Sequence, residues 1–150
     1  MNLHQFRFVQ EAARRNLNLT EAAKALHTKA STALEALDVL ADGFRTQLTE
    51  SGFRAGCPVV AVAVEADNPP VVESAAAAFT RWLAQLEEQL QADGASPEQA
   101  AELAMLATTA IEGAVLVART TGSTTPLDLV HRQLRALVSA ATDSERKASS

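Results

Sequence analysis

The sequence predicts an all-α protein, in the form of a helical bundle preceded by a short helical hairpin, on three observations. Ala and Leu recur throughout the chain, and such segments favour helix. Apolar residues return every three or four positions in most segments, as in amphipathic helices. Only residues 59–64 alternate Val and Ala as a strand would, and a lone strand has no partner. The 150 residues suffice for one modest domain and an appendage.

The first 31 residues are expected to form a partial helix-turn-helix-like segment. Residues 3–15 carry apolar side chains at helical spacing, and Thr20 is a suitable N-cap for a second helix over residues 21–26. Residues 1–29 contain five basic and two acidic residues, a net charge of +3 in a chain whose total is -5. Any contact with nucleic acid is therefore expected near this end.

Residues 32–141 are expected to form the main domain. Thr32 and Glu35 have capping-box spacing and should open a long helix that ends near Gly52. Pro58 is interpreted as the first residue of a short buried helix, and residues 67–70 as a loop. The next helix should cover residues 71–92 and end before Gly94.

Two further helices complete the prediction. Ser96, Pro97 and Gln99 form a strong start signal for a helix that should run to about residue 121, where Gly122 interrupts it. Residues 125–128 should begin the last helix. Residues 142–150 are polar and are expected to be a disordered tail.

The N-terminal motif at residues 18–28 (NLTEAAKALHT), with residues 1–3 (MNL) and 6–9 (FRFV), resembles the start of LysR-family regulators of the CysB type. In that family these residues form the first two helices of a winged helix-turn-helix. The resemblance implies contacts with DNA from Thr20, Lys24, His27, Thr28 and Lys29.

The LysR resemblance stops near residue 28. Residues 32–40 are acidic and apolar, and they offer no Arg, Lys, Asn or Gln for contacts with base edges. We therefore expect weak DNA binding that does not discriminate between sequences and is lost at moderate salt. A hairpin used only for docking is the alternative at this point.

A second set of motifs lies at residues 52–59 (GFRAGCPV), 79–82 (FTRW), 99–104 (QAAELA), 111–114 (IEGA) and 118–120 (ART). It resembles the effector domain of TetR-family repressors of the LmrA/YxaF type over residues 32–141. The resemblance implies that the last two helices form a homodimer through a four-helix bundle. The expected interface residues are Leu103, Leu106, Ala110, Ala114, Val117, Leu127, Val130, Leu134 and Leu137.

A small hydrophobic effector is expected to bind between helices. Such pockets are mainly apolar, so the bulky or soft residues are the candidates, although plain core packing explains each of them as well. The candidates are Phe53, Cys57, Phe79, Trp82 and Met105.

The sequence therefore predicts a repressor-like transcriptional regulator subunit that binds a small molecule and dimerises. The alternative is a dimerisation and ligand-binding module that has lost sequence-specific DNA binding. His4, His27 and His131 lack metal-ligand spacing, and no catalytic motif is found, so neither an enzyme, a metal nor a cofactor is expected. A single cysteine and the lack of a long apolar run indicate a cytoplasmic protein without a membrane segment.

Overall fold

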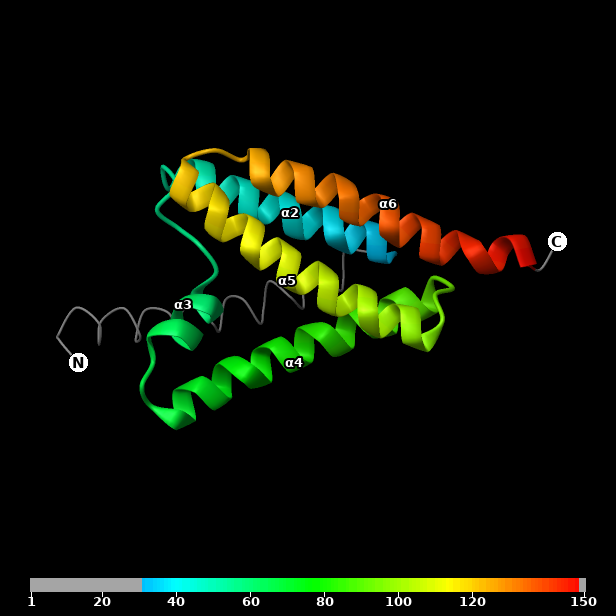
Figure 1. Cartoon of the computed structure of the whole chain (residues 1–150), viewed down its shortest axis with the longest axis horizontal. Helices are drawn as coiled ribbons and strands as arrows, with labels where there is room; N and C mark the ends of the chain where they lie inside the picture. The colour runs from blue at the N-terminus through cyan, green and yellow to red at the C-terminus, as the bar shows by residue number, and fades with distance from the viewer. Residues whose placement is uncertain (1–30, 149–150) are drawn as a thin grey trace.

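The structure is a computed structural model that describes residues 31–148 (Figure 1). This part of the chain contains five helices and no strand, which confirms the all-α prediction. Helix α5 lies between α4 on one side and the pair formed by α2 and α6 on the other, while α3 packs mainly on α4. The helices are α2 (Ala33–Glu50), α3 (Pro58–Glu65), α4 (Pro69–Ala92), α5 (Pro97–Thr121) and α6 (Thr125–Ala148).

Helix α2 begins where its caps predict. The Thr32 hydroxyl accepts a hydrogen bond from the Glu35 amide at 3.2 Å, while the Glu35 carboxylate accepts from the amide and hydroxyl of Ser31, both at 2.7 Å. In a standard capping box the Glu35 carboxylate would accept from the Thr32 amide, whereas here it accepts from Ser31, one residue earlier. The Ala33 amide also donates to the Asp93 carboxylate at 2.5 Å, and this bond fixes the start of α2 to the end of α4.

Helix α3 confirms the helical interpretation of the Val/Ala segment but corrects the expectation that this helix is buried. Val59 is buried against Ala75 and Ala78 of α4, whereas Val64 is 79% exposed. A helix of eight residues that packs mainly on one other helix buries mainly one side.

Helix α4 begins at Pro69, inside the loop expected over residues 67–70. Asn68 occupies the N-cap position, and Pro69 and Pro70 stand in the first turn, where their missing N–H groups remove no helical hydrogen bond. The helix ends at Ala92, and Gly94 follows with a φ of 108° that suits glycine.

The ends of α5 match the sequence signals closely. Ser96 and Gln99 form both halves of a capping box, and Gly122 terminates the helix in the left-handed region. Helix α6 runs to Ala148, beyond residue 142 where a disordered tail was expected. Thr142 is buried, and its hydroxyl donates to the Val138 carbonyl at 3.0 Å, so the polar residue continues the buried face of the helix.

Small residues of α5 form the centre of the main core. Ala100, Ala104 and Ala118 have no exposed surface, which lets the neighbouring helices approach closely. The largest fully buried side chains around them are Leu48, Leu90, Ile111 and Leu127. Charged pairs join α2 to α6 at the edge of this core: Arg45 donates to Asp128 at 2.8 Å, and Asp38 contacts both His131 and Arg135.

Candidate effector site and dimer surface

Three of the five predicted pocket residues lie together beside α3. Cys57 is buried in a small apolar cluster between α3 and α4, which we call the α3–α4 cluster, and Phe79 and Trp82 pack against it. The two aromatic rings meet edge to face, with centroids 5.4 Å apart and an interplanar angle of 87°. The buried members of the cluster are Cys57, Val59, Ala75 and Ala78.

The other two predicted pocket residues lie elsewhere. Phe53 packs against the main core, and its φ of 59° shows that it belongs to the tight turn after α2. Met105 is 52% exposed on the outer side of α5. The structure therefore retains Cys57, Phe79 and Trp82 as one group and does not bring Phe53 or Met105 into it.

Glu112 was not among the predicted site residues, yet it contacts this group from α5. Its carboxylate lies close enough to the Cys57 thiol for each group to affect the pKa of the other, while Oε2 is buried and has no hydrogen-bond partner among residues 31–148. Burial raises the pKa of Glu112 above its usual value, and the nearby Cys57 thiol opposes that rise only in part. Burial and the nearby carboxylate together raise the pKa of Cys57 to about 12, so this thiol stays protonated.

One sequence signal could have identified Glu112. It is the only acidic residue between Glu102 and Asp128, and it interrupts an otherwise apolar part of α5. An acid in the middle of such a helix is informative when its side chain faces inward. The IEGA motif containing it was instead interpreted through its small residues.

The nine predicted interface residues divide into an exposed and a buried group. Leu106, Val117 and Leu137 are exposed, whereas Ala114, Leu127 and Leu134 are at most 5% exposed within the protomer. Leu103, Ala110 and Val130 are half-buried against the main core. The buried three already serve the core of the protomer and offer almost no surface to a second copy.

Large apolar side chains are exposed on the outside of α5 and α6, and three of them, Met105, Leu116 and Leu129, were not among the predicted interface residues. Met105, Leu106, Leu116 and Val117 lie along one face of α5, which we call the outer stripe. Gly113 interrupts this stripe, and a side-chain carbon added there would meet no atom of the described residues within 4 Å. On α6, Leu129 and Leu137 are also exposed, at 46% and 45%.

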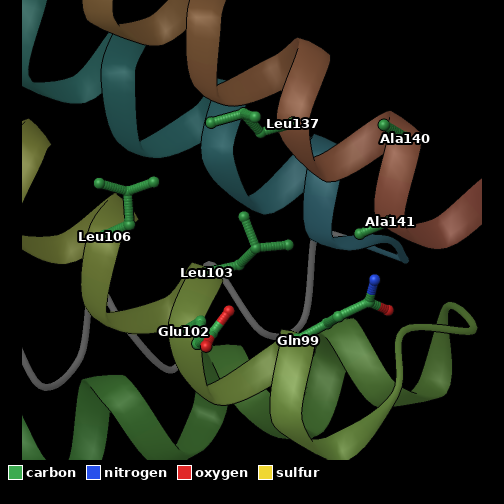
Figure 2. A pocket seen from close by; sticks show the side chains of 7 residues that line it. All are labelled: Gln99, Glu102, Leu103, Leu106, Leu137, Ala140 and Ala141. Atoms are coloured by element: carbon green, nitrogen blue, oxygen red, sulfur yellow. The ribbon is translucent and has the colours of Figure 1, made fainter.

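An open groove of about 410 Å³ separates the beginning of α5 from the end of α6. Figure 2 shows Leu103 and Leu106 pointing from α5 towards α6, where Leu137 faces them. The groove is lined by Gln99, Glu102, Leu103, Leu106, Leu137, Ala140 and Ala141. Apolar surface of α5 is thus continuous with that of α6, and none of the residues predicted to line the effector pocket lines this groove.

The candidate DNA-contacting residues lie outside the part of the chain that the structure describes. They are Thr20, Lys24, His27, Thr28 and Lys29. Residues 33–40, which could have been a recognition helix, form the start of α2 instead. Ala33 and Leu37 are buried in the bundle, and Asp38 pairs with α6, so this segment cannot enter a DNA groove.

Helix α5 is long and apolar enough to cross a membrane, and it alone meets both criteria among residues 31–148. A central helix of a bundle meets the same criteria, and α5 packs on both α4 and α6. Within the same described residues, no group of three His, Cys, Asp or Glu side chains could hold a metal ion.

Comparison with known proteins identifies relatives among transcriptional regulators. An uncharacterized HTH-type transcriptional regulator, found in two strains of Mycobacterium tuberculosis, is 48% identical over 125 residues, which cover 79% of this chain and 64% of the relative. This chain thus matches less than two thirds of that regulator's length. The HTH-type transcriptional regulator CysB of Burkholderia cenocepacia is 62% identical over 55 residues, which cover 36% of this chain and 18% of CysB. No solved structure matches significantly.

The match to a protein family covers most of the described helices. Residues 33–133, from the start of α2 into α6, match the family described as the C-terminal domain of LmrA/YxaF-like transcriptional regulators. This match spans well over half of the chain and agrees with the all-α bundle. The chain belongs to the LmrA/YxaF-like C-terminal domain family of TetR-type transcriptional regulators.

Proposed function

We propose that the protein is a cytoplasmic, homodimeric transcriptional regulator whose described helices bind a small hydrophobic effector and whose first 31 residues contact DNA. The observation that carries the proposal is the outer stripe of α5, which a monomer would leave in water. The family of residues 33–133 and the names of the regulators it resembles support this function over a module without DNA binding. A regulator needs no chemistry on its ligand, so no turnover of the effector is expected.

The outer stripe favours a second copy of the chain as its partner. Leu116 is 55% exposed, and Leu106 and Val117 are nearly half exposed. Burying large apolar side chains is worth about 25 cal/mol per Å² of area removed from water. Gly113 leaves open space in the middle of the stripe, so the backbone of a second α5 could approach it closely.

A pair of matched variants tests this interface. Leu116→Glu puts a charge into the proposed seam, whereas Val64→Glu puts the same charge on the exposed side of α3. Sedimentation velocity should show a dimer for the wild type and for Val64→Glu, and a monomer for Leu116→Glu. If Leu116→Glu stays dimeric while Val64→Glu dissociates, the interface lies at α3 instead.

DNA binding is proposed for the N-terminal segment, whose similarity to LysR-family regulators is supported by the partial identity with CysB. The two segments of a dimer, each of net charge +3, would neutralise about six phosphates. Log affinity should then fall with log salt at a slope of about -5, and at about half that slope for the monomeric Leu116→Glu variant.

Gel shifts from low to moderate salt measure both slopes on the same DNA fragments. Lys24→Ala combined with Lys29→Ala should weaken binding to all fragments by a similar factor, because phosphate contacts carry no sequence information. Unchanged binding in this double variant would remove the N-terminal segment from the DNA contact. A footprint on a defined palindrome that persists at physiological salt would overturn the expected lack of sequence discrimination.

The effector site is proposed at the α3–α4 cluster. Its aromatic and aliphatic side chains suit an apolar ligand, and Trp82 is the only tryptophan in the chain. An effector bound there should change the emission of Trp82 and raise the melting temperature. A ligand that stabilises the protein without altering this emission would place the site elsewhere.

A further inference from the structure

Glu112 reaches the proposed effector site with an unused acceptor. Its Oε2 is buried and has no hydrogen-bond partner in the part of the chain that the structure describes, although the Cys57 thiol is close enough to affect the pKa of the carboxylate. Buried polar groups are nearly always paired, so an unpaired carboxylate oxygen calls for an explanation. A donor that is present only in the liganded state would explain it.

The neighbourhood of Glu112 favours a cation as that donor. Cys57 belongs to the α3–α4 cluster, in which Phe79 and Trp82 present two rings at right angles. Aromatic faces attract cations, and an ionised carboxylate accepts hydrogen bonds but cannot donate them. A ligand with an ammonium group and an apolar body would match all three features.

Helix α3 provides a way for such a ligand to enter. It is the shortest helix of the described chain and packs mainly on α4, while its far side is exposed at Ala63 and Val64. Elements with few buried contacts open at the lowest cost. Cys57 directly precedes Pro58, the first residue of α3, so a shift of this helix would also move the thiol away from Glu112.

We propose that Glu112 is the polar anchor of the effector site and that the effector is an apolar molecule carrying a protonated amine. This inference rests on the proposed effector site, but it requires neither the dimer nor DNA binding.

The test compares three ligands of nearly equal size on the full chain. These are 4-phenylbutylamine, 4-phenylbutanol and 4-phenylbutyrate, which present an ammonium, a hydroxyl and a carboxylate on the same apolar body. Titration calorimetry gives the affinities, and Trp82 emission reports binding at the site. The amine should bind about ten-fold or more tighter than the alcohol, since hydrogen bonds to charged groups are the stronger ones, and the carboxylate should bind weakest.

Two variants assign any preference to Glu112. Glu112→Gln keeps the shape and removes the charge, so the advantage of the amine over the alcohol should fall to about two-fold or less. Glu88→Gln makes the same change at an exposed position on α4 and should retain the full preference. The ligand comparison on the wild type requires no variant, so it remains decisive if a variant folds poorly.

Several outcomes would overturn the inference. If all three ligands quench Trp82 with equal affinity, the effector site stands and Glu112 is not its anchor. If Glu112→Gln retains the preference for the amine, another group supplies it. If no ligand binds at all while the dimer and the salt-dependent DNA binding are present, the regulator survives and the inference fails.

Discussion

Replacing Glu112 with Gln should stabilise the unliganded protein at pH 8 and leave its stability nearly unchanged at pH 4. Burial raises the pKa of this carboxyl in the folded protein above the ordinary value of 4.5. At pH values between 4.5 and the raised pKa, the folded state binds the proton more tightly than the unfolded state does. The stability of the wild type therefore falls as the pH rises through this range. Glutamine cannot ionise, so the stability of the Glu112→Gln variant should not show this fall with pH.

The size of the effect follows from the position of Oε2. A buried acceptor without a partner costs about 1–3 kcal/mol, and more when it is charged. The glutamine amide leaves a neutral group at the same place, so only part of this cost is recovered. We expect a gain of about 1 kcal/mol at pH 8, which for a protein of this size corresponds to about 2–4 °C in melting temperature.

Thermal unfolding followed by circular dichroism at pH 4 to 8 measures this gain. The protomer concentration must be the same for both proteins, because the proposed dimer would make the melting temperature depend on concentration. Glu88→Gln, at an exposed position, should show no comparable dependence on pH. A difference between Glu112→Gln and the wild type that stays flat or shrinks as the pH rises would refute the buried, ionising carboxylate.

Three further predictions concern stability. Ser96→Ala removes the side-chain cap of α5 and should cost about 1 kcal/mol in a denaturant titration, without changing the oligomeric state. Burial opposes ionisation of Asp38, but hydrogen bonds from Arg135 and His131 outweigh it and lower the pKa of the carboxyl. Asp38→Asn should therefore cost about 0.5–1 kcal/mol at pH 7, a modest value because the side chain is more than a third exposed, and this cost should disappear as the pH falls below the ordinary aspartate range. Ala114→Glu should prevent folding instead of merely dissociating a dimer, since a buried unpaired charge costs on the order of 3 kcal/mol or more, and a folded monomer by circular dichroism would contradict this.

Helix boundaries could be predicted because their signals are local. The capping box of Ser96 and Gln99, the prolines at helix starts and the left-handed glycine after α5 each act through residues within one turn. The predictions of the end of α6 and of the burial of α3 were wrong, because contacts between residues far apart in the sequence determine both. Thr142 extends α6 because it is buried, and much of α3 remains exposed because this helix packs mainly on α4.

The candidate sites were harder to predict, because they depend on how each helix is rotated about its axis. Glu112 and Gly113 are adjacent in sequence, yet one oxygen of the Glu112 carboxylate is buried while Gly113 is exposed. Rotating a helix about its axis by one residue, about 100°, would expose a buried position and bury its exposed neighbour. An apolar pattern alone does not fix this rotation in α5, where apolar and small residues occupy most positions around the helix.

The rotation of α5 places small residues inside and large ones outside. Its buried positions are mostly alanines, while Met105, Leu106, Leu116 and Val117 face away from the core. A helix that served only its own protomer would turn its larger side chains inward, where burial stabilises most. The reversed order is what a helix needs when it packs closely within the protomer and presents a larger apolar surface to a partner. For this reason Leu116, and not Ala114, is the residue at which a charge should separate the two copies while each protomer stays folded.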